Sequence, residues 1–434
     1  MRNLVLSFFV LVSLSSADEF EDEFEDGFED ETEEIVVAEV NEKSYYITGN
    51  IEQKVNVATH NKAPHNDLNS FKTSLYLESE YSLNENHKLR VSAKGFYDFI
   101  YKLKNERAYT REEKDEFESE VEIFDFYLQG KITSELDYKV GRQVVVWGRS
   151  DTIRITDILN PLDNRSPGIV DIEDLRLPVG MAKFDYYFDN YNLSAIVIGE
   201  TRYSKNPVYG SDFYPFSTPL PNENIEQKLG YALSFNANFS SWDLSLYASK
   251  TTSDDGYVRV VNAKPIIEHE DVYMLGYAFN YIYDTLLFKS EAAYLDGLKY
   301  ATTGEKTFSR VDVLVGVEYN GISETVIAFE LANRHIKDYA NSLENLPLPI
   351  LKDTTQYALR ANSDFLNATL KANFLVSMFG KELREGGFAR VWFDYDFDDS
   401  VSATLGYVDY MSGSPLFDAI RDNDMLFTSL KYSF

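Results

Sequence analysis

Charged residues of both signs are concentrated in one irregular stretch of the sequence, residues 148–177. Turn formers interrupt it at 160–164 and 166–168, and no helical or strand period runs through it. Rings of charged side chains set selectivity where a channel is narrow. The stretch and nearby strands therefore supply candidates for a constriction. These candidates are Arg142, Arg149, Arg154, Asp157, Asp163, Arg165, Arg310, Glu330, Arg334 and Arg360.

The orientation of Arg142 conflicts with simple alternation. It shares strand parity with Val140, Val144 and Val146, so strict alternation would direct it to lipid, which is costly for a charge. We expect a bulge at Gly141 to turn the side chain inward.

Catalytic and metal chemistry find little support in the sequence. The chain has no cysteine and five histidines. His335 lies near the outer end of a predicted strand with Asn333 on the same face, but no serine is placed beside it by spacing. His60 and His65 form a loop pair without a third metal ligand. We expect no enzyme activity, no cofactor and no metal site.

The residues around the irregular stretch alternate with a period of two. Between 309 and 320, Val311, Val313 and Val315 share one face, and Arg310 and Asp312 share the other. The runs at 89–99, 229–239 and 366–378 repeat this pattern. Strands with one apolar and one polar face are typical of transmembrane β-barrels, in which the apolar face contacts lipid.

Short and long connections between these runs alternate along the chain. About eight short turns and nine long polar loops predict an antiparallel transmembrane β-barrel of about 18 strands. Sixteen strands is the alternative, because the run at 118–130 alternates poorly. A soluble β-sandwich would also alternate, but its connections would not sort by length. A long irregular loop in such a chain is usually functional, so we expect 148–177 to fold into the lumen as an extracellular constriction loop.

The N-terminal residues divide into an export signal and an acidic segment. Residues 1–17 have a basic start, a short apolar run and small residues before residue 18, which predicts a signal peptide. Residues 18–43 are acidic, and we expect them to be disordered in the periplasm. The segment is either a solvated linker or a docking peptide that presents Phe20, Phe24 and Phe28 to a partner. The barrel would then span 44–434.

Composition and the last strand indicate the surroundings of the protein. The net charge is −30, so nucleic acid is not an expected partner. No apolar run after residue 17 is long enough for a helical membrane span. The chain ends in an alternating strand with Phe434 at its terminus. This ending resembles the signal that outer-membrane proteins present to the barrel assembly machinery, so we expect outer-membrane lipid and that machinery as partners.

The segment 141–148, Gly-Arg-Gln-Val-Val-Val-Trp-Gly, followed by Asn-Pro-Leu-Asp at 160–163, resembles an uncharacterised, porin-like family of outer-membrane β-barrels, domain of unknown function 1302. Members of that family tend to be encoded near RND-type exporters and periplasmic lipid-carrier-like proteins. The resemblance therefore implies transport of lipophilic compounds across the envelope, with a periplasmic carrier or an RND-type exporter as partner.

Three functional hypotheses remain open from the sequence. The first is a porin-like channel in the outer membrane of a Gram-negative cell, which passes small or lipophilic solutes and is narrowed by 148–177. The second is a plugged barrel that acts as a binding or assembly scaffold through its acidic segment. The third and weakest is a surface hydrolase that uses His335.

Overall fold

The computed structural model describes residues 45–60, 62–301 and 303–434. The predicted signal peptide and the acidic segment with Phe20, Phe24 and Phe28 lie outside the described residues. The barrel, residues 44–434, forms one compact unit by itself. No helix among the described residues is long and apolar enough to cross a membrane.

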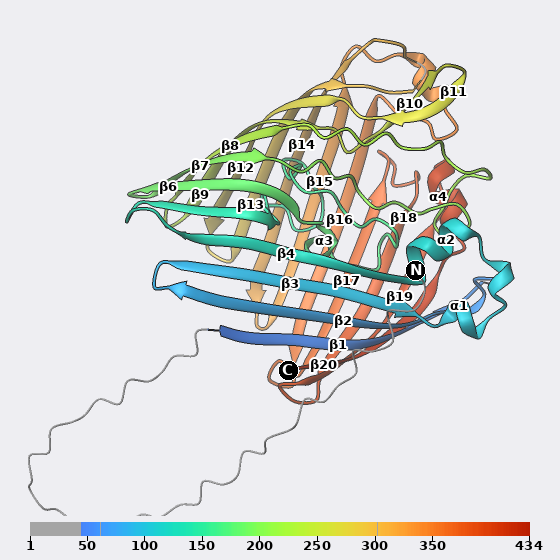
Figure 1. Cartoon of the computed structure of the whole chain (residues 1–434), viewed down its shortest axis with the longest axis horizontal. Helices are drawn as coiled ribbons and strands as arrows, with labels where there is room; N and C mark the ends of the chain where they lie inside the picture. The colour runs from blue at the N-terminus through green and yellow to red at the C-terminus, as the bar shows by residue number, and fades with distance from the viewer. Residues whose placement is uncertain (1–44, 61, 302) are drawn as a thin grey trace, which may run out of the picture. The chain divides into compact units, whose positions relative to one another are not determined.

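Eighteen antiparallel strands form one closed sheet, because the first strand pairs with the last as well as with the second (Figure 1). Each remaining strand pairs with its neighbours in chain order. The strands are β1 (Tyr45–Ala58), β2 (Asp67–Asn84), β3 (His87–Asp98), β4 (Ser119–Lys131), β5 (Leu136–Gln143), β6 (Val179–Phe188), β7 (Tyr191–Ile198), β8 (Gly230–Asn238), β9 (Trp242–Thr252), β12 (Asp271–Tyr283), β13 (Leu286–Leu298), β14 (Phe308–Ile322), β15 (Thr325–Ile336), β16 (Asp353–Phe365), β17 (Leu370–Phe379), β18 (Gly387–Asp396), β19 (Val401–Met411) and β20 (Met425–Ser433).

The connections sort by length as predicted, with eight short turns at one end of the barrel and nine long loops at the other. The long loops carry the helices and an additional two-stranded sheet, most of which lie together at one end (Figure 1). These elements are α1 (Ile100–Leu103), η1 (Glu106–Ala108), α2 (Arg111–Phe117), α3 (Ile172–Leu175), β10 (Tyr257–Val261), β11 (Lys264–Glu268), η2 (Asn341–Asn345) and α4 (Pro415–Ile420).

The wall has an apolar outside and a more polar inside, as the alternation predicted. On β14, Val313 and Val315 are exposed, whereas Asp312 and Leu314 between them are buried. Because an isolated barrel has no lipid around it, exposed apolar side chains mark the surface that contacts hydrocarbon. The prediction of 18 strands is confirmed, and the alternative of 16 is not.

The poor alternation of 118–130 has a local cause. Along β4, Val91 of β3 pairs with Phe126 and Ala93 pairs with Ile123, so Phe124 and Asp125 both lie opposite Ser92. This is a β-bulge, which inserts one extra residue and shifts the parity of the strand.

The C-terminus lies at the seam that closes the barrel. The backbone of Phe434 exchanges hydrogen bonds of 2.9 and 3.0 Å with Gly49, just outside the paired region of β1 and β20. The aromatic ring of Phe434 is exposed and lies beside that of Tyr432. The terminal side chain is therefore held against the first strand.

Candidate pore and its constriction

The chain leaves the barrel wall at Gln143, where β5 ends, and returns to it at Val179, where β6 begins. Residues 144–178 between these points lie inside the barrel, and we call them the inserted segment. Its apolar side chains, among them Trp147, Ile153 and Ile155, form one buried cluster with inward-facing residues of β6 to β16. The predicted insertion of 148–177 into the lumen therefore matches the path of the chain, and the segment packs on one side of the inner wall.

Asn160 holds the two ends of the inserted segment together. Its side-chain oxygen accepts a 2.9 Å hydrogen bond from the backbone N–H of Val145, and its amide group donates a 2.8 Å hydrogen bond to the carbonyl of Leu177. The side chain is almost completely buried. These bonds satisfy backbone groups that have no strand partner once the chain has left the wall.

Glu291 on β13 anchors the start of the inserted segment. Its carboxylate accepts hydrogen bonds from the backbone N–H of Ser150 at 2.7 Å and from the hydroxyl of Thr156 at 2.9 Å. Gly148 lies against this carboxylate with φ +87°, and a Cβ there would come within 2.9 Å of both carboxylate oxygens. Only glycine combines this backbone conformation with so close an approach.

Glu330 on β15 is the second anchor and was predicted as a constriction residue. Its carboxylate accepts from the backbone N–H groups of Asp151 at 2.8 Å, Thr152 at 3.2 Å and Ile153 at 3.1 Å. The hydroxyl of Ser150 donates a further bond of 2.9 Å. A buried carboxylate with this many donors stabilises one path of the loop.

Other predicted residues also meet at the contact between the inserted segment and the wall. Arg149 binds Asp243 on β9 at 2.7 Å. Arg334 on β15 donates to the carbonyl of Arg154 at 3.1 Å, and Arg360 on β16 lies 3.3 Å from Asp171. The structure thus brings the predicted residues of the inserted segment together with those of the wall. Most of these groups hold the segment in place.

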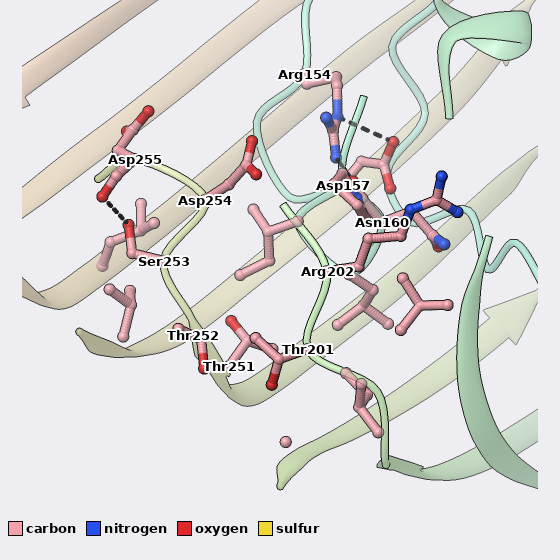
Figure 2. Close-up of a pocket in the computed structure, with 18 of the residues that line it drawn as sticks. Arg154, Asp157, Asn160, Thr201, Arg202, Thr251, Thr252, Ser253, Asp254 and Asp255 are labelled. Atoms are coloured by element: carbon pink, nitrogen blue, oxygen red, sulfur yellow. Dashed lines mark hydrogen bonds and ion pairs between the residues drawn. The ribbon is translucent and has the colours of Figure 1, made fainter. Parts of the chain in front are cut away.

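Arg154, Asp157, Arg310 and Arg334 line a cavity of about 330 Å³ between the inserted segment and β6 to β15, which we call the inner-wall pocket. Arg154 forms a 3.2 Å ion pair with Asp157 on one side of it (Figure 2). Figure 2 shows Asp254 and Asp255 opposite that pair. Val179, Ile198, Val272, Leu295 and Leu298 of the wall also line the inner-wall pocket.

A larger cavity of about 780 Å³ lies on the other side of the lumen, between the inserted segment and β1 to β5. Three of its lysines lie over aromatic rings: Lys72 over Phe96 at 4.4 Å, Lys94 over Phe124 at 3.9 Å and Lys139 over Tyr127 at 3.8 Å. Within the described part of the chain, no carboxylate oxygen lies within 4.0 Å of these three ammonium groups. We call this the lysine-lined cavity.

Asp163 and Arg165, also predicted, reach the lysine-lined cavity from the inserted segment. They form a 2.6 Å ion pair with each other, and Arg165 forms a second of 2.8 Å with Glu120 on β4. Arg165 therefore connects the inserted segment to the β4 side of the wall. A role for these two residues in the constriction stays a prediction.

Arg142 lies at the barrel wall. It pairs with Phe126 in register, and its guanidinium binds Glu200, donates 3.1 Å to the carbonyl of Ile123 and lies 3.8 Å from Glu122. The bulge expected at Gly141 is absent, because β5 pairs with both neighbours without a shift. Gly141 instead has φ +134°. A role for Arg142 in the constriction stays a prediction.

Sequence reasoning did not single out Glu291, Asp171, Arg390 or the three lysines as site residues. Arg390 on β18 binds Asp171, which lies 219 residues earlier in the chain. Alternation predicts that Glu291, Arg390 and the three lysines face inward, but it predicts the same for many other charged strand residues. Only the path of the inserted segment distinguishes those that bind it.

His335, the histidine of the hydrolase hypothesis, lies on β15. His335 binds Asp353 at 2.8 Å, and no serine among the described residues hydrogen-bonds to it. No group of three or more histidine, aspartate or glutamate side chains in the described ranges is placed to hold a metal ion.

Comparison with known proteins identifies the family. A family described as "Protein of unknown function (DUF1302)" matches residues 43–434. The chain belongs to this family. No curated protein is similar enough in sequence to match this DUF1302 member.

Solved structures with the same fold are outer-membrane proteins at low sequence identity. OpdK of Pseudomonas aeruginosa, solved with vanillate, has a TM-score of 0.54 at 8% identity over 90% of this chain and 98% of its own. OccAB3 of Acinetobacter baumannii has a TM-score of 0.52 at 12% identity over 90% of this chain and 99% of its own. OccK8 (OprE) of P. aeruginosa has a TM-score of 0.52 at 9% identity over 90% of this chain and 98% of its own. The closed barrel and these neighbours place this DUF1302 protein in the outer membrane as a porin-like barrel.

Proposed function

We propose that this protein is a channel that passes small or lipophilic solutes across the outer membrane of a Gram-negative cell. The observation that supports the proposal is the lysine-lined cavity, which lies beside the inserted segment. The segment is held against β6 to β16 by Glu291 and Glu330, so it narrows the lumen from one side. Passage would be by diffusion, without covalent chemistry or a cofactor.

Three lysines and the aromatic rings beneath them, within a lining that also carries carboxylates, suit acidic solutes with an apolar or aromatic body. An anion can approach Lys72, Lys94 and Lys139 without displacing a carboxylate, because none lies within 4.0 Å of them in the described chain. The rings beside the lysines offer an apolar surface to the rest of the solute. Vanillate, named with the similarly folded OpdK, is a solute of this chemistry. The proposal for the DUF1302 chain depends on Lys72, Lys94 and Lys139.

Ion selectivity in planar bilayers tests the proposal. Removing one charge about 6 Å from a passing ion in water changes its energy by about 0.7 kcal/mol, about threefold in permeability. We expect Lys94→Gln to lower the anion-to-cation permeability ratio about threefold. Lys264→Gln, in the hairpin formed by β10 and β11, should leave the ratio unchanged. A folded barrel that carries no current would overturn the proposal and favour the plugged scaffold.

We also propose a periplasmic carrier or an RND-type exporter as the partner that delivers or receives the solute. The support for this is the family resemblance at 141–148 and 160–163. Affinity capture from periplasmic extract, with the mature chain and with a chain lacking 18–43, tests it. Loss of one defined partner on deletion is expected, and identical capture by both chains would contradict docking through the acidic segment.

A further inference from the structure

The barrel wall is incomplete beside β4. This strand pairs with β3 along nearly its whole length, from Ser119 to Gly130. It pairs with β5 only from Phe126 to Lys131. The cause is the inserted segment: the residues that would continue β5 and β6 upward have left the wall for the lumen, so the upper half of β4 has no strand partner on that side.

The segment that follows β7, residues 199–206, lies across from this free edge. Between them is a cavity of about 510 Å³ in the wall, which we call the wall slot. Arg142 lies at its lower end, next to Gln143, where the pairing of β5 with β6 stops. The wall slot is lined by Glu120, Val121 and Glu122 on one edge, and by Arg202, Lys205 and Ile225 on the other.

Side chains rather than a backbone ladder join the two edges of the wall slot. Lys205 binds Glu120, and its ammonium lies 2.9 Å from Glu122. Arg202 lies 2.5 Å from the same Glu122 carboxylate. The hydrogen bond from Arg142 to the carbonyl of Ile123 is the one described bond from this side to the β4 backbone between 119 and 125. Opening the wall slot therefore requires these cations to exchange ion-pair partners, and no backbone ladder has to break.

The wall slot lies at the depth of the apolar belt. Val121 and Ile123, on the free half of β4, are 89% and 57% exposed. Their register partners on β3, Gly95 and Ala93, pair in turn with outward-facing leucines of β2. On the far edge, Ile225 is also exposed. Hydrocarbon therefore surrounds the outer mouth of the wall slot.

The wall slot adjoins the pore lining, because Glu120 and Glu122 line both the slot and the lysine-lined cavity. We propose that the wall slot is a lateral passage between the lumen and the membrane for amphiphilic anions, molecules with a carboxylate head and an apolar body. The head would replace Glu120 and Glu122 as the partner of Lys205 and Arg202. The apolar body would leave past Val121. This inference rests on the proposed channel function and names its substrate class.

A photo-reactive fatty acid with a diazirine on its acyl chain tests the passage in bilayers that contain the folded protein. After illumination, adducts are mapped by peptide mass spectrometry. We expect adducts on residues 201–206 and on Glu120 and Glu122, in addition to outward residues such as Tyr231. The chain has no cysteine, so a Val121→Cys, Ile225→Cys variant, with one thiol on each edge of the outer mouth, can be bridged across the slot by a bismaleimide.

Bridging should lower the adducts on 201–206 at least fivefold, while the adducts on Tyr231 stay unchanged. The same double variant without the bismaleimide is the matched control, and it should keep the adducts on 201–206. Adducts confined to outward residues in the wild-type chain, or adducts on 201–206 that survive bridging, would overturn the lateral passage. Ion conductance of the wild-type chain in the same bilayer reports separately on the proposed channel.

Discussion

The attachment of the inserted segment to Glu330 allows a quantitative prediction. In Glu330→Gln, the amide nitrogen must face at least one N–H that the carboxylate now accepts, either that of Asp151 or those of Thr152 and Ile153. Hydrogen bonds to a charged group contribute about 1.5–3 kcal/mol, against about 0.5–1.5 kcal/mol for neutral pairs. Part of the loss is offset because the neutral side chain costs less to bury. The net loss of docking free energy is about 2 kcal/mol, which shifts the equilibrium of the segment toward the undocked state roughly thirtyfold.

Thiol reactivity measures this equilibrium directly. Ile153 belongs to the inserted segment and is buried against the inner wall, so an Ile153→Cys reporter in the cysteine-free chain should react only when the segment undocks. We expect Glu330→Gln to raise the reaction rate of the reporter roughly thirtyfold, in proportion to the undocked population. Asp394→Asn is the matched control, because Asp394 lies on the inner wall and binds Asn373 and Thr404 instead of the segment.

A reporter rate for Glu330→Gln within about twofold of the parent would refute the reasoning. It would mean that the apolar cluster, rather than the carboxylate anchor, determines the docking of 148–153. An equal rise in Asp394→Asn would show that the reporter senses a general loosening of the barrel.

Two further predictions concern close approach and pH. Gly148→Ala should raise the Ile153→Cys rate at least tenfold because its Cβ would meet Glu291, whereas Gly304→Ala, at positive φ in open space, should not. Burial raises the pKa of Glu113 on α2 to about 8, and nearby Asp212 adds to the rise. Since the folded pKa exceeds the unfolded value, docking of α2 is strongest below about pH 4.5 and weakens as pH rises through 8. Relative to its rate on an unstructured peptide at the same pH, trypsin should therefore cleave α2 faster at pH 9 than at pH 6. Glu113→Gln should remove that pH dependence, and an unchanged dependence in this variant would contradict the assignment.

Much of the barrel follows from a local rule that the sequence displays openly. The period of two shows which face of each strand is apolar, and the lengths of the connections show how many strands there are. Both patterns can be read locally because neither depends on distant contacts. The insertion of 148–177 was predictable for the same reason: a long, charged segment without a period cannot form wall.

The contacts within the lumen depend on information that a single sequence does not display. Glu291 and Glu330 have the same inward parity as many other charged residues, and only the folded path of the inserted segment brings them to its backbone N–H groups. The expected bulge at Gly141 was wrong because β5 pairs with β4 and β6 without a shift. The bulge near this position lies on β4, at Phe124 and Asp125, in its pairing with β3. The wall slot was not predicted because pattern reasoning assumes that every strand is paired along its whole length.

Current through a barrel with Lys94→Cys tests the central claim most directly, namely that water and solute pass along β1 to β5 beside the docked segment. We predict that wild-type protein conducts in planar bilayers and that a bulky methanethiosulfonate attached to the introduced thiol lowers the single-channel current of this variant in one step. The same reagent should not change the single-channel current of a Ser245→Cys barrel, because that thiol lies buried beneath the inserted segment. A wild-type barrel without current, or a Lys94→Cys current that the reagent does not change, would contradict the account.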